Sequence, residues 1–71
     1  MLNAKKLDEA IKNSGMTVKA IAEKSGILRE TLYNRLNGRG EFTASEIVAL
    51  TNTLRLTKKQ RDEIFLNEKL N

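Results

Sequence analysis

Five polar or aromatic side chains recur at helical spacing between residues 29 and 37 of this 71-residue chain. A helix that turns by about 100° per residue places them on one arc, which comprises Arg29, Glu30, Tyr33, Asn34 and Asn37. Arginine fits the two acceptors of guanine, asparagine fits the donor and acceptor of adenine, and glutamate accepts from the amino group of cytosine. The arc therefore has the chemistry of a base-reading surface, and the base-contacting candidates are Arg29, Glu30, Tyr33 and Asn34.

An ordinary solvated helix face is the alternative interpretation of the same arc. Arginine, glutamate and asparagine are common on protein surfaces, and Leu32 and Leu36 on the opposite side would anchor any surface helix. Only the surrounding sequence favours the base-reading interpretation over this one.

Two short helices joined by a tight turn account for the stretch from Thr17 to Gly38. Thr17 is suited to cap the first helix, and the apolar residues after it recur at helical spacing. Gly26 ends this helix, because glycine tolerates the left-handed conformation of a C-terminal turn. The second helix follows Leu28 and closes at Gly38. The pattern predicts a helix-turn-helix unit, in which the two helices cross steeply.

The same stretch carries the residues of a known family pattern, and these are Thr17, Ala22, Gly26-Ile27, Thr31-Leu32 and Asn37-Gly38. The pattern continues downstream through Glu41-Phe42-Thr43, Glu46-Ile47, Leu54 and Ile64-Phe65. With these residues the chain resembles the Cro and phage-repressor family, above all the short phage-encoded repressor-like proteins of Gram-positive hosts. The resemblance implies an all-α fold, a compact bundle of about five short helices of the lambda-repressor type. Helices two and three would form the helix-turn-helix and bind double-stranded DNA.

Candidates for phosphate contacts surround the predicted base-reading arc. The start of the first helix of the pair offers free amides and the positive end of a helix dipole, and in the family this helix start lies against the DNA backbone. Further polar groups lie near the end of the second helix. The phosphate-contacting candidates are Thr17, Val18 through its amide, Lys19, Arg35, Asn37 and Arg39.

Two residues depart from the family pattern. Leu28 stands where the family usually has a polar cap, so the second helix lacks a side-chain acceptor there, at a cost of roughly 1 kcal/mol. Leu28 is expected either to touch a thymine methyl group or to hold the helix start. Arg35 occupies a position that is commonly apolar, and we expect its stem to lie over the core edge while its guanidinium reaches water or phosphate.

Length and composition fit one small domain that spans residues 1–71. The chain contains neither cysteine nor histidine, and so it lacks the usual zinc ligands and the usual base of a nucleophilic triad. We expect no enzymatic activity, no metal or other cofactor and no small-molecule substrate. No apolar run approaches the length of a signal sequence or a membrane span, so we expect a cytoplasmic protein that does not enter membranes.

The net charge of +4 is unevenly distributed. Residues 1–40 hold eight lysines and arginines against four acids, whereas residues 41–71 hold five of each. The whole basic excess lies in the half with the predicted helix-turn-helix, which favours attraction to a polyanion, although many soluble proteins carry a similar charge.

The flanking sequence predicts three further helices. One follows Asn3, its expected N-cap, and runs to about Asn13. The capping boxes Thr43 with Glu46 and Thr57 with Gln60 open the other two. We expect Phe42 to anchor the core. The apolar residues on both flanks of the fourth helix, Ile47, Val48, Leu50 and Leu54, are expected to be buried.

The C-terminal end has more apolar residues than a short terminal helix needs. A single reading helix contacts few base pairs, so specific binding normally uses two copies on half-sites about 34 Å apart. The candidates for a pairing surface are Phe65, Leu66 and Leu70. The alternative is that they complete the core. The pair would be a homodimer on DNA or a heteromer with another phage regulator.

The leading hypothesis is a sequence-specific transcriptional regulator that occupies an operator through the helix at residues 29–37. The alternative is a modulator of the same genetic switch that binds a partner repressor protein, which Glu30 favours because an acid on the reading face repels phosphate. The antidote of a toxin system, or another small regulator, is a third possibility.

Overall fold

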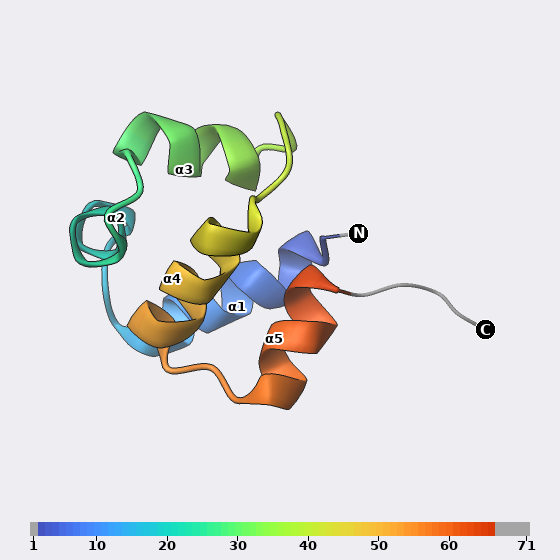
Figure 1. The fold of residues 1–71 in the computed structure, drawn as a ribbon. Helices are drawn as coiled ribbons and strands as arrows, with labels where there is room; N and C mark the ends of the chain where they lie inside the picture. Colours follow the sequence, from blue (N-terminus) through green and yellow to red (C-terminus); the bar gives the residue numbers. More distant parts are fainter. Residues whose placement is uncertain (1, 67–71) are drawn as a thin grey trace.

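Five short helices form the structure, a computed structural model that describes residues 2–66 (Figure 1). They are α1 (Ala4–Ser14), α2 (Val18–Ser25), α3 (Arg29–Leu36), α4 (Ala44–Leu54) and α5 (Lys58–Phe65). No strand occurs within residues 2–66. The predicted all-α fold, with the helix-turn-helix as its second and third helices, is confirmed.

Side-chain caps determine where four of the helices begin. The side chains of Asn3 and Thr17 each accept from the amide three residues further on, at 3.1 Å. Thr43 and Thr57 form complete capping boxes at the starts of α4 and α5. All four predicted caps are confirmed. Only α3 has an N-cap residue without a side-chain hydrogen bond, and that residue is Leu28.

The turn between α2 and α3 is fixed by backbone conformation and by apolar burial. Gly26 adopts the left-handed conformation at φ 80° and ends α2. Ile27, just before the N-cap, and Leu32, in the second turn of α3, are both buried in the core, which is the arrangement of a hydrophobic staple. Ile27 therefore holds the start of α3, and Leu28 does not take this role.

The core contains one or more buried side chains from every helix. Its members are Leu7, Ile11, Ile21, Ala22, Ile27, Leu32, Leu50, Ile64 and Phe65. Phe42 packs against them as expected, and its ring meets that of Phe65 edge to face at 5.4 Å between centroids. The expectation that both apolar flanks of α4 are buried is wrong at Val48, which is 58% exposed. The reason is that α1, α2 and α5 pack on the other faces of α4 and leave this position uncovered.

The third helix lies along one edge of the molecule. It packs mainly against α2, whereas α4 is surrounded by α1, α2 and α5. Figure 1 shows α3 across the top of the view, with no other described element above it. The outward side of α3 is thus open. None of the helices in residues 2–66 has the length and the apolar composition needed to cross a membrane.

Candidate nucleic-acid interface

The outward arc of α3 presents three of the four base-contacting candidates to solvent. Arg29, Glu30 and Tyr33 are exposed, while Leu32 on the inner side is completely buried. The helix ends at Leu36, so Asn37 is its C-cap residue and not part of the helix. Asn37 is exposed, and its amide donates to backbone carbonyls in the last turn.

A pair of hydrogen bonds joins Asn34, the fourth base-contacting candidate, to Arg39 in the following loop. Nη1 of Arg39 donates to Oδ1 of Asn34 at 3.2 Å, and the Arg39 amide donates to the Asn34 carbonyl at 2.8 Å. The first bond orients the Asn34 amide, and it leaves the NH₂ group and one lone pair of the oxygen for a base. It also holds the exposed guanidinium of Arg39 beside the arc. The arc and one phosphate candidate are thus arranged before a ligand arrives.

The start of α2 supplies a second set of donors. The Thr17 hydroxyl accepts from the amide of Ala20, and the Thr17 carbonyl accepts from Ile21. The amides of Val18 and Lys19, in the first turn, have no carbonyl partner within the helix. Together with the positive end of the helix dipole and the exposed Lys19 side chain, they suit a phosphate.

A shallow hollow brings α2 and the start of α3 together. It has a volume of about 410 Å³, and its lining includes Lys19, Glu23, Leu28 and Arg29. A phosphate candidate and a base candidate therefore border one concave surface. Leu28 lies in the same lining and is 75% exposed, so its side chain faces solvent and not the core.

Three cations of this surface carry charges that no acidic side chain of residues 2–66 neutralises. The ion pairs in this part of the chain are Lys6–Glu63, Lys12–Asp8, Arg35–Glu46 and Arg61–Asp62. None of them uses Lys19, Arg29 or Arg39. Their positive field is therefore directed outward from the helix-turn-helix, although the exposed Glu23 and Glu30 reduce it.

Arg35 does not join this surface. Its side chain turns towards α4, where its Nε lies 3.6 Å from Oε1 of Glu46. Sequence reasoning missed Glu46 as the partner, although a charged residue at an inward-facing position signals that one must exist. The prediction that Arg35 contacts phosphate stays a prediction, without support from the placement of its side chain.

The three residues of the predicted pairing surface do not share one environment in the structure. Phe65 is buried against Phe42 and completes the core, which is the alternative that the sequence left open. Leu66 is 54% exposed and stays available for contact with another molecule. Leu70 lies outside the described residues.

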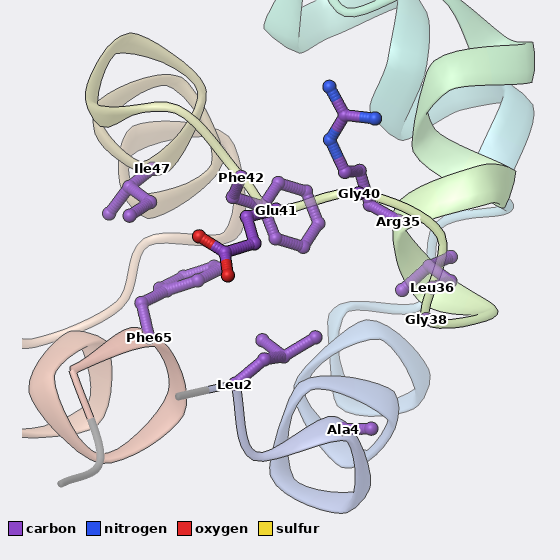
Figure 2. Close-up of a pocket in the computed structure, with 10 residues that line it drawn as sticks. All are labelled: Leu2, Ala4, Arg35, Leu36, Gly38, Gly40, Glu41, Phe42, Ile47 and Phe65. Carbon is purple, nitrogen blue, oxygen red and sulfur yellow. The ribbon is translucent and has the colours of Figure 1, made fainter.

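A separate cavity of about 360 Å³ lies behind the C-terminal end of α3 (Figure 2). Its lining is mostly apolar and comes from the N-terminal residues, the end of α3, the loop after α3, α4 and the end of α5. No base-contacting candidate lines it. The cavity is therefore distinct from the outward arc.

Comparison with models of protein families gives a match to this chain. The family model described as helix-turn-helix matches residues 7–59, a segment that includes all of α2, α3 and α4. Neither a curated protein nor a solved structure matches the chain. Since the match covers well over half of the sequence and contains the whole candidate interface, the chain belongs to the Cro/C1-type helix-turn-helix family of DNA-binding regulators.

Proposed function

We propose that this protein is a sequence-specific transcriptional regulator that occupies an operator by inserting α3 into the major groove. The observation that carries the proposal is the open outward arc of α3, which lies beside the start of α2 with its free amides. A major groove accepts one α-helix, and a helix with exposed Arg and Tyr side chains and a half-buried Asn beside them can read its base edges. By occupying the operator, the protein would block transcription, as the resemblance to Cro and phage repressors implies.

The contacts divide into two kinds. Affinity comes from phosphate contacts by Lys19, the amides at the start of α2, Arg39 and Asn37. Selectivity comes from the base-contacting residues Arg29, Glu30, Tyr33 and Asn34. We add Leu28 to this second set, because its exposed side chain borders the same hollow as Arg29 and suits a thymine methyl group.

A partner-binding modulator is the second candidate function. The observation in its favour is the exposed carboxylate of Glu30 in the middle of the arc, which repels phosphate and suits a basic protein surface. A gel-shift comparison of the operator with a repressor of the same genetic switch, with and without this protein, separates the two functions. A modulator changes the repressor's shift and produces none of its own.

Selection of bound sequences from random duplex DNA by the purified protein tests the proposal most directly. We expect an enriched palindrome whose half-sites are about one helical turn apart, because two copies must present α3 to the same face of the duplex. Recovery of unrelated sequences would reject sequence-specific binding.

Salt dependence and alanine variants test the division of contacts. We expect the logarithm of the binding constant to fall linearly with the logarithm of the salt concentration. Lys19→Ala should reduce the magnitude of this slope by about 0.9 and weaken binding to all duplexes alike. Arg29→Ala should cost about 1–3 kcal/mol at one base pair and relax the preference there. Lys24→Ala, which removes an exposed lysine at the other end of α2, is the matched control and should change neither property. A flat salt response of the wild-type protein contradicts the mechanism.

A further inference from the structure

We propose that Arg35 is a positioning residue, which sets the orientation of α3 through its ion pair with Glu46 and so sets how the outward arc enters the groove. The inference rests on the proposed function. It assigns Arg35 a role other than the phosphate contact that the sequence predicted.

The side chain of Arg35 is largely removed from solvent. It is 22% exposed, its partner Glu46 is 18% exposed, and Nε of Arg35 lies 3.6 Å from Oε1 of Glu46. Nε is fully buried and has no hydrogen-bond partner within the described residues. A partly buried cationic group with an inaccessible Nε is stabilised by the nearest carboxylate, which here belongs to α4.

The carboxylate of Glu46 is itself fixed in place. Its Oε1 accepts from the amide of Thr43 at 3.0 Å, and the Thr43 hydroxyl accepts from the Glu46 amide at 3.2 Å. This capping box at the start of α4 limits the freedom of the Glu46 side chain. Arg35 therefore pairs with a group whose position is set by a central helix of the core.

The loop after α3 is shaped around the same guanidinium. Nη1 of Arg35 donates to the carbonyl of Arg39 at 3.5 Å, and a Cβ atom at position 40 would lie 2.8 Å from Nη1. Figure 2 shows the guanidinium close to Gly40 and pointing away from Leu2 and Phe65. One side chain thus joins the end of α3, the following loop and the start of α4.

This ion pair adds to the apolar contacts of α3, in which Leu32 lies in the core and Leu36 packs against it. α3 packs mainly against α2, and of the ion pairs within residues 2–66 only Arg35–Glu46 connects α3 to another helix. Replacing a buried ion pair by apolar groups often leaves stability unchanged or higher. The Arg35–Glu46 pair is partly buried, so the geometry that it imposes explains it better than a gain in stability does. Its effect would then appear in base selectivity more than in stability.

The experiment compares Arg35→Met, Glu46→Gln and the double variant on the selected operator and on a scrambled duplex, over a range of salt concentrations. Gln preserves the capping box, and the double variant avoids an uncompensated charge. We expect each single variant to reduce the ratio of the two affinities about tenfold, the equivalent of one misplaced base contact. We expect the double variant to lose no more than either single one, since both act through the same pair. The salt slope should match that of the wild-type protein.

Two binding results would overturn the proposal. A salt slope that falls by about 0.9 in Arg35→Met, as in the reference variant Lys19→Ala, identifies a phosphate contact. Additive losses in the double variant show that Arg35 and Glu46 act separately.

Amide NMR spectra of the free protein provide a readout that does not depend on DNA. We expect Arg35→Met and Glu46→Gln to shift the signals of residues 29–34 in the same direction, because both variants release the same helix. Shifts confined to the neighbours of each substitution would overturn the proposal. If selection yields no preferred sequence, the proposed function fails, and these spectra still decide whether Arg35 orients α3.

Discussion

Leu28 shows how a single residue can be unfavourable for the helix and useful for a ligand. As an N-cap it leaves the first amides of α3 without a side-chain acceptor, which costs roughly 1 kcal/mol, and it exposes most of an apolar side chain to water. Ile27 already anchors the helix start, so no contact of Leu28 within the fold offsets the missing cap or the exposed apolar surface. Among the groups in a major groove, the thymine methyl is the one that an apolar side chain fits.

We expect Leu28→Ala to remove a preference for thymine over uracil at one position of the operator. The lost contact should amount to about 1 kcal/mol, the value of roughly one buried methyl group. Binding to operators with single thymine-to-uracil replacements measures it, since uracil lacks only the methyl group. The thermal midpoint should not change, because the side chain lies outside the core. A variant that distinguishes the two bases as well as the wild-type protein does would contradict this role.

At the scale of the element, local signals in the sequence were sufficient for most of the fold. The caps at Asn3, Thr17, Thr43 and Thr57 and the turn at Gly26 depend on residues within four positions of each other, so the sequence predicts them without knowledge of packing. The third helix was predicted one residue too long, because nothing local distinguishes Asn37 inside a helix from Asn37 as its C-cap.

The candidate site was predictable only in part. The arc of α3 follows from helical periodicity, and the exposure of Arg29, Glu30 and Tyr33 agrees with it. The hydrogen bond of Asn34 with Arg39 and the ion pair of Arg35 with Glu46 depend instead on how the loop after α3 folds back. Glu41 lies in that loop and Glu46 follows it, and only packing decides which of the two acids meets Arg35.

The two glycines of this loop provide a matched test of its close approach to α3. Gly38 and Gly40 both have a positive φ, of 85° and 83°, so an alanine at either position should cost about 1 kcal/mol of stability through backbone strain. Only at position 40 would the new Cβ meet Arg35, while nothing lies within 4 Å at position 38. We therefore expect Gly40→Ala to reduce the free energy of unfolding in urea by more than Gly38→Ala does. Equal losses of unfolding free energy in the two variants would show that the close approach of position 40 to Arg35 does not constrain the loop.

At the scale of the whole molecule, the proposed function requires a particular stoichiometry on DNA. One copy of α3 spans only a few base pairs, so we propose that two copies pair on the operator, with Leu66 in the contact. The burial of Phe65 reduces the apolar surface available for pairing. We therefore expect weak pairing in solution that becomes complete on DNA.

Leu66→Glu should weaken binding to the full operator about tenfold, equivalent to roughly 1.4 kcal/mol at the contact, and leave binding to an isolated half-site unchanged. Val48→Glu is the control, because Val48 is similarly exposed but lies on α4, outside the predicted pairing surface. Sedimentation of the protein with full and half operators measures the stoichiometry. Equal effects of the two variants would exclude Leu66 as a specific contact.

The link between Asn34 and Arg39 has a consequence for how such a regulator evolves or is retargeted. A substitution at position 34 would remove the proposed base contact and, in the same step, release the guanidinium of Arg39, the proposed phosphate contact. Variants with a new base preference would therefore bind DNA weakly at first, which slows the change from one operator sequence to another. Libraries that randomise positions 34 and 39 together should yield tight binders to new sequences more often than libraries that vary position 34 alone.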